Sequence, residues 1–156
     1  MKSVMKFFVL MIVSSSLMLS GCKKDDDEVV TPTTTYTNVL SAKIDGIQFT
    51  ASMPLAQMTM GFLQIGGSNA AGSIQVILSY DVPTGTVTVT SGSEEAVYWD
   101  SGAESYWPGT GSIVVSKHDQ TNNIIEGTFT ASLEEFSSSE VISVSNGVFK
   151  ISYIEH

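Results

Sequence analysis

The chain has 156 residues with 7 basic and 16 acidic side chains, a formal net charge of −9, and no arginine. Partners with phosphate backbones need clustered Lys or Arg, so this balance argues against nucleic-acid binding. The single cysteine excludes internal disulfides, cysteine-rich metal sites and, at its position near the start, a cysteine catalytic centre.

Residues 1–21 have the layout of a cleaved export signal. Lys2 and Lys6 precede an apolar run over residues 7–13, and small residues then lead to the junction Leu19-Ser20-Gly21-Cys22. A membrane-spanning helix needs roughly 20 predominantly apolar residues, and serines interrupt this run earlier. The pattern therefore predicts secretion and removal of the segment in preference to a membrane span.

The junction resembles the lipobox of bacterial lipoproteins, with a leucine three positions before the cysteine. The resemblance implies that Cys22 becomes the mature N-terminus and carries diacylglycerol and a further acyl chain such as palmitate, attached by the lipoprotein processing machinery. Each buried methylene contributes about 0.8 kcal/mol, so two or three chains give lasting attachment to a membrane. The alternative is an ordinary secretory signal that leaves Cys22 as a thiol.

A charged tether follows, and residues 29–37 extend it with threonines around a proline. Like charges repel and keep such a segment extended. Without residues 1–21 the chain keeps 5 lysines against 16 acidic residues, a net charge of −11. The start of the tether resembles the Cys-Lys-acidic export signal of surface lipoproteins in Bacteroidota and consists of Lys23, Lys24, Asp25, Asp26, Asp27 and Glu28. This resemblance implies an outer-membrane lipoprotein that the export machinery displays on the cell surface; a periplasm-facing lipoprotein is the alternative.

Residues 38–156 have the size of a single domain and alternate apolar with polar side chains between Gly, Asn, Asp and Pro clusters. This pattern is typical of an all-β protein. We predict an antiparallel β-sandwich of about nine strands, with a partly closed β-barrel as the alternative. The predicted strands are residues 38–44, 47–53, 58–65, 73–80, 86–90, 112–117, 125–133, 141–145 and 148–154.

Turn signals and large aromatics organise these strands. Asp45-Gly46 and Asn146-Gly147 favour hairpin turns because both positions tolerate positive φ. Residues 91–109 are the least regular part, and we expect a long, partly ordered excursion there. The expected core anchors are Phe49, Phe129 and Phe149.

Residues 42–51, 125–131 and 146–149 together resemble small Bacteroidota lipoproteins that form a family of unknown function. The shared features are a "DG-x-x-F-x-A" opening, a "GTF" strand and a closing "NG-x-F" hairpin, in this order. The resemblance implies the lipoprotein location and the β class, and it implies no particular activity.

The strongest binding candidate is the aromatic segment over residues 98–109, which contains Tyr98, Trp99, Tyr106 and Trp107. Two carboxylates accompany these rings, and aromatic faces beside acids are typical of sugar-binding surfaces, where rings stack on apolar sugar faces and carboxylates accept hydroxyl hydrogen bonds. The alternative is that the rings fold back and cap the end of the sandwich, because large aromatics usually bury most of their area.

Enzyme signatures are weak. The glutamate pairs at residues 94–95 and 134–135 are adjacent, so on a strand their side chains point to opposite faces and form no acid/base dyad. The sequence has no nucleophile elbow and no glycine-rich phosphate loop. His118 and His156 lack metal-ligand spacing, and we expect His118 on the solvated surface.

Loop carboxylates leave a calcium-dependent module as a remote alternative, with Asp119 and Asn122 or Asp100 and Glu104 as ligands. Turn formation explains the same residues without a metal. The sequence therefore favours a cofactor-free, non-enzymatic, surface-anchored module with a glycan or protein ligand. The alternative is a structural envelope lipoprotein without a ligand site, and a glycan hydrolase is more remote.

Overall fold

The computed structural model describes residues 36–155, which form ten strands and contain no helix. This described part accordingly has no helix that is long and apolar enough to cross a membrane. The predictions for the export signal, for Cys22 and for the charged residues after it lie outside the described residues. The strands are β1 (Val39–Ile44), β2 (Ile47–Thr50), β3 (Leu55–Thr59), β4 (Phe62–Asn69), β5 (Gly72–Ser79), β6 (Gly85–Thr90), β7 (Ala96–Asp100), β8 (Ser105–Asp119), β9 (Ile124–Glu135) and β10 (Val141–Ile154).

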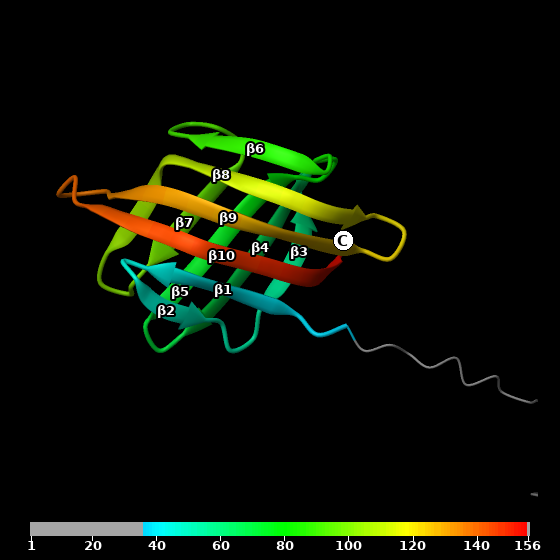
Figure 1. Ribbon diagram of the computed structural model, residues 1–156, viewed down its shortest axis with the longest axis horizontal. Coiled ribbons are helices and arrows are strands. Elements are labelled where there is room, and N and C mark those ends of the chain that lie inside the picture. The colour runs from blue at the N-terminus through cyan, green and yellow to red at the C-terminus, as the bar shows by residue number, and fades with distance from the viewer. Residues whose placement is uncertain (1–35, 156) are drawn as a thin grey trace, which may run out of the picture. The chain divides into compact units, whose positions relative to one another are not determined.

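The predicted antiparallel β-sandwich is confirmed, with ten strands in place of about nine (Figure 1). One layer has the order β2-β1-β10-β9-β8-β6, and the strands β3-β4-β5-β7 cross behind it as the second layer. All ten strands belong to one hydrogen-bonded sheet, because β8 pairs with β7 and the end of β10 pairs with β3. The pairing of β10 with β3 is parallel, and the other pairings are antiparallel.

The core lies between the layers and follows the predicted alternation. On β5 the residues Ile74, Val76 and Leu78 are buried while their neighbours are partly exposed. Successive strand residues point to opposite faces, so this alternation places one face of each layer in the core. The three predicted aromatic anchors are confirmed as buried core residues: Phe49, Phe129 and Phe149.

Two phenylalanines and two glycines pack reciprocally across β9 and β10. Phe129 lies opposite Gly147, and Phe149 lies opposite Gly127. The two rings stack with centroids 6.4 Å apart. A Cβ atom on Gly147 would lie 2.6 Å from the ring of Phe129, and one on Gly127 would overlap the ring of Phe149. Each ring therefore occupies the space that a side chain on the opposite residue would need.

The predicted hairpin turn at Asn146-Gly147 is wrong, because β10 continues through it. Asn146 has a φ of 50° and the register against β9 shifts between Val144 and Gly147, as expected of a β-bulge with one extra residue. β10 pairs with β9 on one side and with β1 on the other, so it has no freedom to reverse here. The Asn-Gly pair provides the left-handed residue of a bulge and the space for Phe129.

Two other segments differ from the prediction. The expected strand at residues 58–65 is a hairpin of β3 and β4 with its turn at Met60 and Gly61, where φ is 53° and 85°. Methionine is rare at positive φ, so Gly61 is a lone turn signal at this reversal and is easily missed. The expected excursion at residues 91–109 contains β7 and the beginning of β8, whose alternation is too short to stand out in the sequence.

We predict that Gly147→Ala lowers the free energy of unfolding by about 1–3 kcal/mol, because the added methyl group overpacks the core against Phe129. Urea unfolding followed by fluorescence measures this loss. Gly66→Ala is the matched control, since its Cβ would meet only the Ile74 carbonyl oxygen at 3.7 Å. Equal stabilities of the two variants would contradict the packing argument. So would a Gly147→Ala substitution that lowers the free energy of unfolding by the same amount in a Phe129→Leu background.

Candidate functional site

β7 and β8 form a hairpin whose turn is organised by Asp100. The Asp100 carboxylate accepts hydrogen bonds from the Gly102 backbone N–H at 2.6 Å and from the Ser105 hydroxyl at 2.9 Å. The Ser101 backbone N–H donates to the Glu104 carbonyl at 3.0 Å. In the structure Asp100 and Glu104 therefore stabilise the turn. The aromatic side chains on both sides of the turn alternate between the two faces of the hairpin.

Two of the four predicted binding aromatics point into the core. Trp99 is 6% exposed and Tyr106 is 5% exposed. Trp99 meets the ring of Phe49 edge-on, with the centroids 5.2 Å apart. The Tyr106 hydroxyl donates to Glu104 Oε2 at 2.7 Å, and this hydrogen bond raises the pKa of Tyr106 to about 12. For these two residues the capping alternative describes the structure.

The other two aromatics lie on the outer face. Trp107 is 51% exposed and meets Tyr98 edge-on, with ring centroids 5.8 Å apart. Phe136 is 80% exposed in the loop between β9 and β10, and its ring centroid lies 5.8 Å from that of Trp107. We call the three side chains Tyr98, Trp107 and Phe136 the aromatic platform. Phe136 was missed in the sequence, because only the pairing of Trp107 with Glu134 brings its loop to β8.

The loop that carries Phe136 is held by Glu135. This carboxylate accepts hydrogen bonds from the Ser138 backbone N–H and, at 2.8 Å, from the Ser137 hydroxyl. Hydrogen bonds from Ser138 and Ser137 hold the pKa of the Glu135 carboxyl at about 2, well below its usual range. The Phe136 backbone N–H also donates to the Ser105 carbonyl at 3.2 Å. These hydrogen bonds therefore hold the backbone of the loop that carries Phe136 against β8 and β9.

A pocket of about 280 Å³ lies beside the platform. Hydroxyl, amide and carboxylate groups are close to aromatic faces in it, and this combination can stack on an apolar ring surface while it hydrogen-bonds hydroxyl groups. Its outer lining is formed by Ser73 and Gln75 of β5, Tyr98 and Asp100 of β7, and Ser105 and Trp107 of β8.

Another hollow, of about 410 Å³, lies on the outer face of the other layer around the bulge at Asn146. Its lining is mainly Ser, Thr and Val side chains of β8, β9 and β10. Phe129 belongs to the lining but is buried, so the hollow offers no exposed aromatic face. The pocket beside the platform is chemically the more specific of the two.

The remaining candidates have structural roles. The two oxygens of Asp119 accept hydrogen bonds from the backbone and side-chain nitrogens of Asn122 at 3.0 and 2.9 Å, and these bonds lower the pKa of Asp119. Within residues 36–155 no group of three or more His, Cys, Asp and Glu side chains is arranged to hold a metal ion. In the adjacent glutamate pair, Glu134 is exposed and Glu135 is buried, so the two point to opposite faces.

The expectation of a solvated His118 is wrong. Its Nδ1 atom lies 2.9 Å from the Val82 carbonyl oxygen, and its Nε2 atom lies 3.3 Å from the Tyr153 hydroxyl. The rings of Tyr80 and Tyr153 also meet the imidazole edge-on. His118 is half-buried because residues far apart in the sequence converge at this end of the sandwich.

The fold and site define an all-β sandwich domain with an exposed aromatic platform. The chain belongs to the family DUF6252, described as a domain of unknown function, which matches residues 36–151. The resemblance to an uncharacterised family is thereby confirmed. No curated protein and no solved structure matches the chain.

We predict that Trp99→Ala destabilises the domain by about 3–5 kcal/mol, because it opens a cavity in the core. Trp107→Ala removes a half-exposed ring and should cost less than about 1 kcal/mol. Urea or thermal unfolding of the two variants measures both values. Similar large losses for the two would show that the platform is a structural cap.

Proposed function

We propose that this protein is a lipid-anchored, non-enzymatic binding module of the outer membrane, and that its aromatic platform binds a neutral glycan. The exposed ring of Trp107 at a pocket lined by aromatic and polar side chains is the observation that carries the proposal. Such exposed aromatic groups, rimmed by polar side chains, mark interaction sites.

The platform is suited to stacking on a sugar ring. Trp107 packs against both Tyr98 and Phe136, with ring centroids 5.8 Å apart in each pair. The hydrogen bonds of Glu135 hold the adjacent loop, so binding needs little ordering of the site. Gln75 and Asp100 supply polar atoms at the edge of the rings, where sugar hydroxyls would lie.

The charge distribution favours a neutral ligand. The chain carries a net charge of −9, and Asp100 is the single charged residue on the pocket lining. Basic groups that would pair with an anionic sugar are absent from that lining. A uronate or sulfate group would be repelled, because like charges across an interface oppose association.

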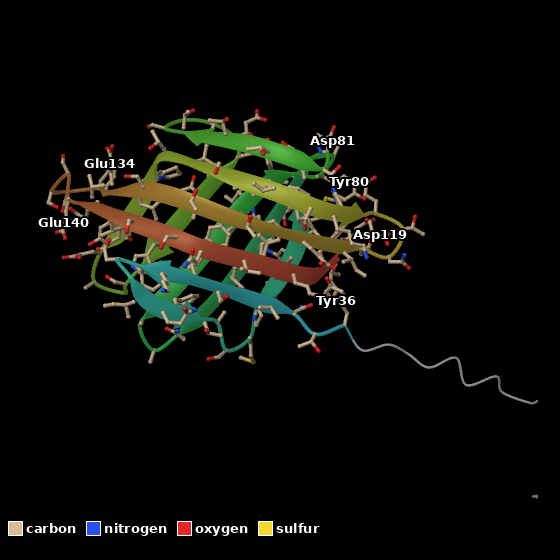
Figure 2. The ribbon with its side chains drawn as sticks, viewed as in Figure 1. Tyr36, Tyr80, Asp81, Asp119, Glu134 and Glu140 are labelled. Carbon is tan, nitrogen blue, oxygen red and sulfur yellow. The ribbon has the colours of Figure 1, made fainter. Side chains whose placement is uncertain are left out.

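The position of the platform supports display away from an anchor. The Tyr36 hydroxyl donates to Glu126 at 2.9 Å, whereas Trp107 pairs with Glu134 eight residues further along β9. At about 3.4 Å per strand residue the separation is about 27 Å. Tyr36 and Glu134 lie at opposite ends of the domain (Figure 2). A tether that joins the domain at Tyr36 would therefore be attached at the end of the domain far from the platform.

The anchoring proposal rests on the lipobox at Cys22 and on the acidic segment that follows it, from Lys23 to Glu28. Two or three acyl chains hold a protein durably, whereas one chain does not. This segment resembles surface-export signals, and its like charges would repel one another. Surface display would give the platform access to glycans outside the cell.

We predict that Trp107→Ala weakens glycan binding about tenfold or more, because truncation of an aromatic hot spot costs on the order of 2 kcal/mol. Affinity electrophoresis of residues 36–156 in gels with soluble β-glucan, mannan, xylan or starch measures retention. Tyr98→Ala should act in the same direction, and Tyr36→Ala, an aromatic change at the other end of the domain, should leave retention unchanged. No retention in any neutral gel, or stronger retention by polygalacturonate, would contradict the proposal.

We predict that intact cells release the domain on protease treatment only when Cys22 is present. The experiment compares the full-length protein with a Cys22→Ala copy. Immunoblotting of cells and medium detects the released domain, and metabolic labelling with palmitate detects the acyl chains. If the lipidated domain is protected from protease until the outer membrane is opened, the domain lies in the periplasm. That outcome would favour the structural envelope role over surface binding.

A further inference from the structure

The outer face of the layer β3-β4-β5-β7 is nearly free of charge. These four strands contain one charged residue, Asp100, although the chain as a whole carries 23 charged side chains. The uncharged polar groups on this face include three half-buried glutamines: Gln57, Gln64 and Gln75. Such a surface offers hydrogen bonds without selecting for an ionic partner.

The strand register places these groups in rows that run across the strands. One row consists of Leu55, Gly66, Gln75 and Tyr98, each directly opposite the next. Cross-strand neighbours of this kind lie about 5 Å apart, so the row leads from the aromatic platform across the whole layer. On one side it is flanked by Gln57 and Gln64, which are paired with each other. On the other side it is flanked by Ser68, Ser73, Asp100 and Ser105, again in direct register.

Gly66 leaves this row without a side chain on β4. A Cβ atom there would meet only the Ile74 carbonyl oxygen at 3.7 Å, which is an ordinary contact, so packing does not require glycine. Its neighbour Gly67 differs, because a Cβ atom on Gly67 would lie 2.6 Å from Ala51. Glycine weakens a strand interior and often marks a close approach by a ligand or another backbone. Between Leu55 and Gln75 the missing side chain leaves a gap one residue wide, which we call the trough.

We infer that the glycan on the aromatic platform is a linear neutral chain that continues over β7 and β5, across this trough on β4, and on to β3. The inference rests on the proposed function and adds the shape and the length of the ligand. Three strand spacings span about 14 Å, which is longer than a single sugar residue, and the platform on β8 lengthens the site. Gln75, Gln64 and Gln57 present amide groups that donate to and accept from hydroxyl groups along this path.

The test is the dependence of affinity on oligosaccharide length. Isothermal titration uses residues 36–156 with cello-, manno- and xylo-oligosaccharides from the dimer to the hexamer. For the series that binds, affinity should rise at least about tenfold from dimer to hexamer, since linked subsites add to one another. Gly66→Tyr, which has room for its Cβ, should fill the trough and remove that rise while it preserves both thermal stability and the affinity for the dimer.

Thr88→Tyr is the matched control, because Thr88 is exposed on the outer face of β6 in the other layer. It should leave the length dependence unchanged. Equal affinities for dimer and hexamer, or full hexamer binding by Gly66→Tyr, would overturn the proposal that the trough binds the glycan. In that case a loss of binding in Trp107→Ala would still support the glycan function. A protein that binds none of these series and none of the neutral polysaccharides would overturn both proposals.

Discussion

The pairing of β9 with β8 on one side and with β10 on the other is the constraint on which the rest of the structure depends. These long strands keep a continuous ladder, while their outer edges change partners: β8 pairs with β7 and then with β6, and β10 pairs with β1 and then with β3. Both layers of the sandwich are therefore hydrogen-bonded to one central unit, which consists of β8, β9 and β10. The reciprocal packing of Phe129 on Gly147 and Phe149 on Gly127 fixes the register of that unit from within.

The same register creates the candidate site. Because Trp107 lies opposite Glu134, the loop after β9 brings Phe136 to the exposed indole ring, and Glu135 fastens this loop with its hydrogen bonds. Alternation along β7 and β8 sends Trp99 into the core and leaves Tyr98 and Trp107 outside. One short hairpin thus supplies both a core anchor and two of the exposed side chains of the candidate site.

Charge separates the two layers in a way that bears on function. Within the described residues the lysines lie on β1, β8 and β10 and most strand carboxylates on β8 and β9, whereas the layer behind them is almost neutral. Repulsion among acidic groups opposes self-association, and a neutral face can approach an uncharged polymer without desolvating ions. Membership in the DUF6252 family supplies no activity, so the platform and the neutral face are the features that experiments should address first.

The sequence by itself determined the elements with a strong local period. The inward residues of β5, the three core phenylalanines and the all-β class follow from alternation, because side-chain direction along a strand depends only on neighbouring residues. Tertiary structure decided what local signals leave open. Asn146-Gly147 can form a hairpin or a bulge, and pairing on both sides of β10 selects the bulge. Four aromatics were recognisable as candidates from the sequence. Cross-strand register decides which of them are buried, places Phe136 beside Trp107 and creates the trough at Gly66, because it joins residues that are distant in the chain.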